Sequence, residues 1–232
     1  ETYRSLAHLP FEARIAKLRD PEIRARIIDE PPDPDPVNFL GRQVRGFDTM
    51  FLLGDPPDYE QPPEASIAAR ARAKGIRPEE LAYDLMMEQD GRAQLYLAVA
   101  NYGGGSLDAS YEMLSQPDIV PGLGDGGAHY GTICDSSYST YLLTHWARDR
   151  VKGDRFPLEF LVRKLTSDTA RAYGLNDRGQ LKPGLLADVN VIDFDALKLF
   201  RPEAIADLPA GGKRLVQRAE GYRYTVKSGQ VT

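Results

Sequence analysis

The chain has 232 residues, of which 42% are hydrophobic and 27% are charged, and its formal net charge is −5. This length and composition predict a folded protein with a sizeable core and exclude an intrinsically disordered chain. Acidic and basic residues are interspersed, so no basic stripe predicts nucleic-acid binding and no polybasic patch predicts membrane binding. The single cysteine, Cys134, excludes an internal disulfide and a multi-thiolate zinc site, which favours a cytoplasmic location.

The first part of the chain predicts helices that local capping signals delimit. Asp20 is followed by proline at the first helical position, and the prolines from Pro31 onward end that helix. Ser66 is a predicted N-cap, and Gly75 is a predicted helix end. The four predicted helices span residues 10–18, 20–30, 66–75 and 78–89.

Short apolar runs predict strands at residues 49–54, 94–100 and 119–123. A helix capped by Ser106 is predicted between the last two runs. This order predicts a strand-helix-strand unit of the parallel type. Helical spacing follows at residues 138–150, and two further helical pieces are predicted at 157–165 and 167–173.

The pattern changes after Gly179. A Pro183-Gly184 turn precedes residues 187–193, in which apolar and polar residues alternate. Residues 222–231 read as a terminal hairpin. The C-terminal part therefore predicts strands of a small antiparallel sheet.

The most informative segment is the glycine-rich run 120–130, which holds Asp125 directly after an apolar stretch. Glycine tolerates positive φ and close backbone approach, so Gly124-Asp125-Gly126-Gly127 can turn sharply and present the carboxylate at the rim of a cavity. In a parallel α/β fold, that rim carries catalysis. Asp125 is then a general base or a metal-linked carboxylate; the alternative is a turn aspartate that binds backbone amides.

The chain has three histidines, and none forms an H-x-H or H-E-x-x-H pair that would place two imidazoles on one metal ion. His8 and His145 are expected to be surface and core residues, respectively. His129 follows Asp125 by four residues and could reach the same cavity; the alternative is a loop histidine that packs. Cys134 reads as a small buried hydrophobe rather than a nucleophile.

Three segments together resemble the amidohydrolase superfamily and, within it, the N-acyl-D-amino-acid deacylases. The segments are the Gly124-Asp125-Gly126-Gly127-Ala128-His129 motif, the helical stretch 165–175, and the stretch 179–193 with its G-x-L-x-P-G-x-x-A-D pattern. The resemblance implies an α/β fold, a TIM-like metal-dependent barrel followed by a β-sandwich, in which Asp125 ends the eighth barrel strand.

The resemblance also implies a chemistry. The aspartate that matches Asp125 takes a proton from a zinc-bound water that attacks an amide carbonyl, and it then delivers the proton to the leaving amine. The substrate is a small N-acyl amino acid or a related amide, and we expect Gly126, Gly127 and His129 to contact it.

The chain departs from the family in lacking the upstream H-x-H pair, the bridging ligand and two later histidines. An eight-stranded barrel takes about 250 residues, and the chain opens on Glu1 rather than methionine. We therefore expect a C-terminal portion: residues 1–178 form part of the barrel with a helical insertion, and residues 179–232 form sandwich strands. Its metal ligands and its partner, the N-terminal half of the same enzyme, lie upstream, so this segment alone is expected to bind no metal and to be inactive.

Two alternatives remain open. The C-terminal motifs are shared with cyclic amide and imide hydrolases of the same superfamily. From a different class, the chain could be a non-catalytic remnant that acts as an interaction module, because a barrel cut open exposes strand edges and apolar faces.

Overall fold

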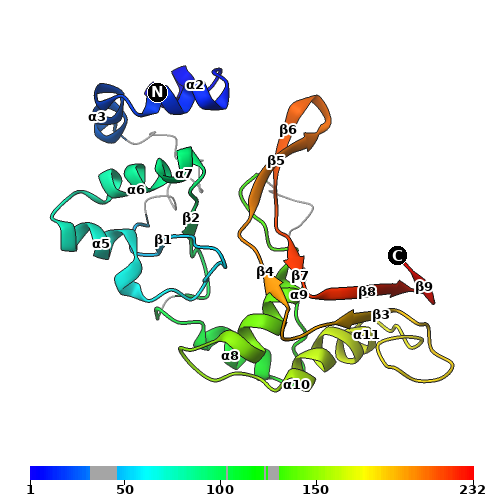
Figure 1. The fold of residues 1–232 in the computed structure, drawn as a ribbon. Helices are drawn as coiled ribbons and strands as arrows, with labels where there is room; N and C mark the ends of the chain where they lie inside the picture. The colour runs from blue at the N-terminus through cyan, green and yellow to red at the C-terminus, as the bar shows by residue number, and fades with distance from the viewer. Residues whose placement is uncertain (32–45, 103, 123, 125–130) are drawn as a thin grey trace. The chain divides into compact units, whose positions relative to one another are not determined.

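The computed structural model describes residues 1–31, 46–102, 104–122, 124 and 131–232. The chain is mixed α/β and divides into two compact units (Figure 1). Unit 1 consists of Glu1–Leu53 and Asp58–Leu107, and unit 2 consists of Gly54–Pro57 and Asp108–Thr232.

Unit 1 surrounds one two-stranded antiparallel sheet with helices. Its elements are α1 (Thr2–Leu6), α2 (Phe11–Leu18), α3 (Pro21–Asp29), β1 (Met50–Leu52), η1 (Pro63–Ala65), α5 (Ile67–Lys74), α6 (Pro78–Met86), α7 (Glu88–Gly91) and β2 (Leu95–Leu97).

The helix boundaries of unit 1 confirm the capping signals. The Asp20 carboxylate accepts a hydrogen bond from the Glu22 amide at 2.8 Å, at the start of α3. The Ser66 hydroxyl accepts one from the Ala69 amide at 3.2 Å, at the start of α5. Gly75 ends α5 with φ +66°, a left-handed conformation that glycine adopts without steric cost.

The sheet of unit 1 has a core on each face. In the antiparallel register, Met50 lies opposite Leu97 and Phe51 lies opposite Tyr96. Met50 packs into a cluster with α5 and α6, whereas Phe51 packs with Tyr102 on the other face. The buried residues of the larger cluster are Met50, Ile67, Ala71, Leu81, Ala82 and Leu85.

Unit 2 contains a helical part followed by short strands. Its elements are α8 (Asp108–Ser115), α9 (Tyr138–Tyr141), η2 (Leu142–Asp149), α10 (Leu158–Arg163), η3 (Lys164–Asp168), α11 (Thr169–Ala172), β3 (Val189–Ile192), β4 (Lys198–Leu199), β5 (Glu203–Leu208), η4 (Pro209–Gly211), β6 (Gly212–Val216), β7 (Ala219–Glu220), β8 (Tyr222–Lys227) and β9 (Gln230–Val231).

An aromatic cluster joins the helices of unit 2 around a buried cation. The Arg150 side chain is 0% exposed and donates to the Asp108 carboxylate at 2.6 Å. Its guanidinium lies 4.7 Å from the ring centroid of Trp146. Tyr111 of α8 stacks on Phe156, with ring centroids 4.2 Å apart. Burial of a paired arginine against aromatic faces fixes α8 against η2.

The helices predicted at 138–150 and 157–173 form, with one difference in each. η2 and η3 are π-helical, with wider turns than an α-helix has. The second stretch is one continuous helical run through α10, η3 and α11, rather than two pieces. Thr166 stays within the run, and its hydroxyl donates to the carbonyl of Val162 at 2.6 Å.

The C-terminal strands confirm the predicted small antiparallel sheet. β3, β8 and β9 form a three-stranded sheet in which β8 and β9 are the terminal hairpin. β4 pairs with β7, and β5 pairs with β6. All strand pairs within the described ranges are antiparallel, and no barrel closes among them.

The predicted parallel strand-helix-strand unit is wrong in its second strand. β2 and α8 form, although α8 begins at Asp108, two residues after the predicted cap Ser106. Ile119–Gly122 is not a strand, and Ile119 is 38% exposed. Pro121 has no amide to donate to a ladder, and the Ile119 carbonyl accepts from a lysine side chain instead. β2 pairs with β1 in antiparallel fashion.

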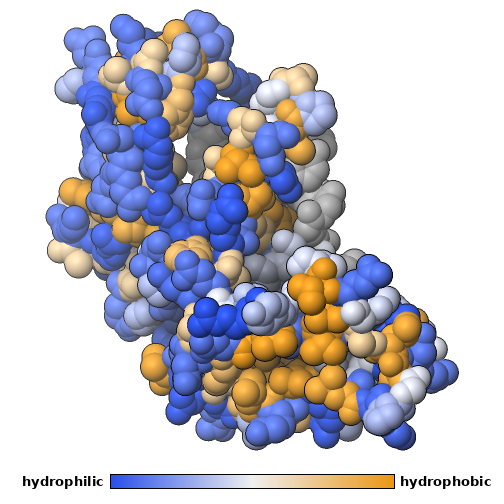
Figure 2. Space-filling view, turned by 45° about the vertical axis from the view of Figure 1, so that its right-hand side comes forward, coloured by the Kyte–Doolittle hydropathy of each residue, from blue (hydrophilic) through white to orange (hydrophobic). Residues whose placement is uncertain are grey.

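Unit 2 exposes apolar side chains on its strands. Val191 of β3 and Tyr224 of β8 are cross-strand neighbours and are 46% and 61% exposed, respectively. Figure 2 shows hydrophobic residues gathered on one face of this unit. Contiguous exposed apolar surface is typical of an interaction site.

Throughout the parts of the chain that the structure describes, no helix is both long enough and apolar enough to span a membrane.

Candidate functional site

The predicted site residues Asp125, Gly126, Gly127 and His129 lie outside the described residues. The structure does describe the chain that leads to them, up to Gly122 and at Gly124, and the chain that follows them from Gly131 onward. The geometry of the candidate site therefore rests on its two flanks.

The two flanks meet at Gly124. A Cβ at this position would lie 2.6 Å from the carbonyl oxygen of Asp135 and 3.2 Å from the Cα of Ser136. Both atoms belong to backbone, which cannot move aside as a flexible side chain can. Gly124 therefore has to be glycine for this close approach, as the sequence pattern indicated.

The flank after the site is anchored at the start of α9. The Asp135 carbonyl accepts from the Tyr138 amide at 3.0 Å. In α9, the Thr140 hydroxyl and the Tyr222 hydroxyl are hydrogen-bonded at 2.8 Å, and the Ser137 hydroxyl donates to the Gln217 side chain. The exit from the glycine-rich run is thus tied to the C-terminal strands.

Cys134 and Asp135 lie side by side in this flank. Cys134 is half-buried, and burial, followed by the Asp135 carboxylate, raises the pKa of its thiol. A raised pKa favours the neutral thiol over the nucleophilic thiolate, which agrees with the reading as a small hydrophobe. Within the described chain, the Oδ1 atom of Asp135 is buried and has no hydrogen-bond partner.

The remaining histidines have structural environments. His8 is exposed at the surface. His145 stacks on Tyr141, with centroids 4.6 Å apart, and contacts Trp146 edge to face at 5.1 Å. His8 agrees with the expected surface role, whereas His145 is half-buried and is not one of the buried core residues.

The donor groups of the described residues do not converge on a metal site. Across residues 1–31, 46–102, 104–122, 124 and 131–232, no group of three or more His, Cys, Asp and Glu side chains could hold a metal ion. A zinc site takes three or four such ligands. The described residues therefore do not fit a metal centre.

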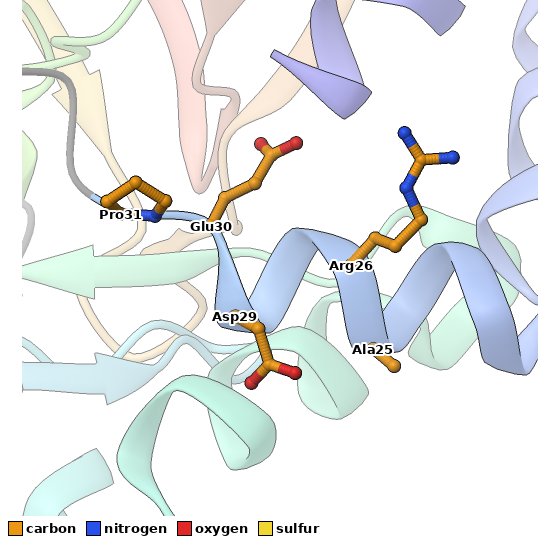
Figure 3. Close-up of a pocket in the computed structure, with 5 residues that line it drawn as sticks. All are labelled: Ala25, Arg26, Asp29, Glu30 and Pro31. Atoms are coloured by element: carbon orange, nitrogen blue, oxygen red, sulfur yellow. The ribbon is translucent and has the colours of Figure 1, made fainter.

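A shallow concavity of about 360 Å³ lies beside α3 in unit 1 (Figure 3). Figure 3 shows Arg26 and Glu30 pointing to one side of the helix and Asp29 pointing to another. The carboxylates are already engaged: Asp29 pairs with Arg77 at 2.8 Å, and Glu30 accepts from the Thr2 amide at 2.8 Å. The lining residues are Ala25, Arg26, Asp29, Glu30 and Pro31, none of which is a predicted site residue.

Sequence reasoning missed Lys164 and Asp135. Lys164 is 1% exposed, and its ammonium contacts carbonyls 45 and 48 positions away in the sequence. No local pattern signals such a contact, because the partners are distant in sequence. The group of Asp135 that approaches Gly124 is its backbone carbonyl, which every residue type has. The only sequence signal for this contact is therefore the glycine at position 124.

Comparisons with known proteins agree with the resemblance seen in the sequence. A D-aminoacylase of Alcaligenes xylosoxydans xylosoxydans is 37% identical over 95 residues, which make up 37% of this chain and 19% of that protein. No solved structure matches the chain. The profile of the amidohydrolase family matches residues 4–232. Because that match covers nearly the whole sequence, the chain belongs to the amidohydrolase family.

Proposed function

We propose that this chain is the C-terminal portion of a metal-dependent hydrolase of non-peptide C–N bonds, of the N-acyl-D-amino-acid deacylase type. The family match over residues 4–232 carries the proposal, and the similarity to a D-aminoacylase supports this substrate class. In this proposal, the helical part belongs to a TIM-like barrel, and the strands from β3 onward belong to a β-sandwich.

Asp125 is the proposed proton carrier. Its carboxylate takes a proton from the attacking water as the C–O bond forms at the acyl carbon, and it gives that proton to the amine nitrogen as the C–N bond breaks. Gly126, Gly127 and His129 are the proposed substrate contacts. The close approach at Gly124 supports these roles because it fixes one end of the run that carries them.

The metal has no ligand set among the side chains that the structure describes. In this proposal, its ligands lie in the upstream part of the enzyme. Zinc is the metal that the family resemblance favours.

The decisive experiment uses the polypeptide that contains this chain together with its upstream part, loaded with zinc. The assay measures release of free amino acid from N-acetyl-D- and N-acetyl-L-amino acids, and ring opening of a six-membered cyclic imide. Turnover of the D-series supports the proposal. Ring opening alone identifies a cyclic amide or imide hydrolase, and inactivity toward every substrate rejects the deacylase proposal.

The exposed apolar strands favour a second candidate, a non-catalytic interaction module. Val191 and Tyr224 would then lie in an interface. A variant with Tyr224→Lys keeps the strand but places a charge on this face, so an interaction module would lose its partner while an enzyme would keep its turnover.

A further inference from the structure

Lys164 is a buried lysine whose bonds go to the main chain. Its ammonium donates to the Gln116 carbonyl at 2.5 Å and to the Ile119 carbonyl, and it lies 5.4 Å from the ring centroid of Phe160. No ion pair to a carboxylate is present for it within the described ranges. Burying an ammonium costs free energy unless it is hydrogen-bonded, so the two hydrogen bonds to the Gln116 and Ile119 carbonyls strongly favour this position of both carbonyls.

The segment that Lys164 holds is not part of a sheet. Within the described chain, Ile119–Gly122 is not a strand, so no β-ladder fixes it. Ile119 is 38% exposed, and its amide reaches the Gln116 carbonyl at 3.4 Å, a long hydrogen bond. The lysine thus provides the anchoring that a neighbouring strand would provide in a parallel sheet.

The backbone of Lys164 is itself held in place. The residue begins η3, in the middle of the continuous helical run, and the Thr169 hydroxyl donates to its carbonyl at 2.6 Å. Leu161, one turn earlier, is 1% exposed. π-helical turns occur frequently at functional sites because they redirect a side chain out of the α-helical pattern.

Two fixed points therefore bracket the run that leads to Asp125. Lys164 holds the segment at Gln116 and Ile119, and the Asp135 backbone packs against it at Gly124. Asp125 is the next residue in the chain.

We propose that Lys164 is a positioning residue for the reaction, because its ammonium fixes the segment that places the proposed proton carrier Asp125. This inference rests on the proposed function. A displacement of about 1 Å at a reacting group can reduce turnover by about 10²-fold. The proposed substrate contacts Gly126, Gly127 and His129 lie on the same run as Asp125, so loss of the anchor changes both kcat and KM.

The test compares two variants of the complete enzyme that each remove a cation from backbone carbonyls. Lys164→Met removes the bonds to Gln116 and Ile119. Arg148→Met is the control. The Arg148 guanidinium donates to the carbonyls of Phe194 at 2.5 Å, Asp195 at 3.4 Å and Leu197 at 2.8 Å and pairs with the Asp149 carboxylate at 2.6 Å, all outside the run that leads to Asp125. Each variant is measured for kcat, KM, zinc content and melting temperature.

We expect Lys164→Met to lower kcat per folded molecule by at least about 10-fold and to raise KM, with zinc content close to that of the wild type. Lys164→Arg should recover part of this loss, because it retains a cation that can donate to both carbonyls. Arg148→Met should lower the melting temperature and keep kcat. If Lys164→Met yields no folded enzyme, Lys164→Gln replaces it, since its neutral amide still offers N–H donors, and an intermediate loss of kcat is then expected.

Wild-type kcat in the folded Lys164→Met or Lys164→Gln enzyme would overturn the inference, and so would an equal loss of kcat in Arg148→Met. Asp125→Asn separates this failure from that of the proposed function. If Asp125→Asn loses turnover while Lys164→Met keeps it, only the positioning role is rejected. If Asp125→Asn turns over normally, the proposed role of Asp125 is rejected.

Discussion

At the scale of single residues, the close approach at Gly124 predicts that a larger residue at this position is not tolerated. A Cβ at Gly124 would lie 2.6 Å from the Asp135 carbonyl oxygen, whereas one at Gly122 would meet no atom of the described residues within 4 Å. We expect Gly124→Ala to force the two flanks apart, lowering kcat and destabilising the fold by about 1–3 kcal/mol. Gly122→Ala is the matched control and should change both little. Thermal unfolding and steady-state kinetics measure the pair; equal effects of the two substitutions would contradict the packing seen at Gly124.

Asp125→Asn tests the proposed chemistry directly. Asparagine keeps the size and shape of the side chain in a glycine-rich turn but cannot accept the proton from water. In the complete enzyme, we expect kcat to fall by at least about 10²-fold, with melting temperature and zinc content nearly unchanged. An aspartate with a purely structural role would give the opposite result, in which stability changes and kcat per folded molecule does not.

The residue scale also shows where sequence reasoning succeeds. Asp20, Ser66 and Gly75 act on neighbours within a few positions, so their roles as caps follow from local sequence and are confirmed. Lys164 acts on Gln116 and Ile119, far away in the sequence, and only the fold brings them together. The role of Asp125 stays a prediction.

At the scale of elements, the Asp188 carboxylate holds the terminal hairpin. It accepts from the Lys227 ammonium at 2.8 Å, the Ser228 amide at 2.8 Å and the Arg178 guanidinium at 2.9 Å. The hydrogen bond from Lys227, followed by that from Ser228, lowers the pKa of Asp188 below its ordinary value. The stabilisation is therefore present above the unfolded-state pKa of about 4 and is lost as the pH falls through the lower folded-state value.

We accordingly expect Asp188→Asn to destabilise the protein near neutral pH and to flatten the loss of stability as the pH falls below about 4. Denaturant unfolding followed at several pH values measures this slope. Glu220→Gln, which removes an exposed carboxylate on β7, serves as the control and should keep the wild-type slope. A slope in Asp188→Asn as steep as that of the wild type would rule out Asp188 as its source.

Elements differ in how far the sequence predicts them. Helices such as α5 and the hairpin of β8 and β9 depend on local periodicity and turns, and both form as predicted. The apolar run 119–123 has the composition of a buried strand, yet Ile119–Gly122 does not pair with another strand. A parallel strand needs partners that are distant in sequence, so composition alone does not predict whether this run forms a strand.

At the scale of the whole molecule, the sequence predicts a domain boundary at residue 178. The main change from unit 1 to unit 2 instead falls between Leu107 and Asp108. Within unit 2, the helices and strands are joined by side-chain bonds such as that from Arg148 to the Leu197 carbonyl at 2.8 Å. The partners of such hydrogen bonds are distant in sequence, so the residue pattern does not predict them. The two-domain division at residue 178 stays a prediction.

The last prediction concerns the chain of residues 1–232 on its own. It holds three histidines and one cysteine, and the described residues contain no cluster that could ligate a metal ion. Zinc needs three or four converging ligands, so we expect far less than one zinc per chain after dialysis and no release of amino acid from an N-acyl amino acid. Adding the upstream part of the enzyme should restore both. Elemental analysis and the amino-acid assay on one preparation decide the matter, and a stoichiometric zinc that supports turnover in residues 1–232 alone would place the ligands within this chain.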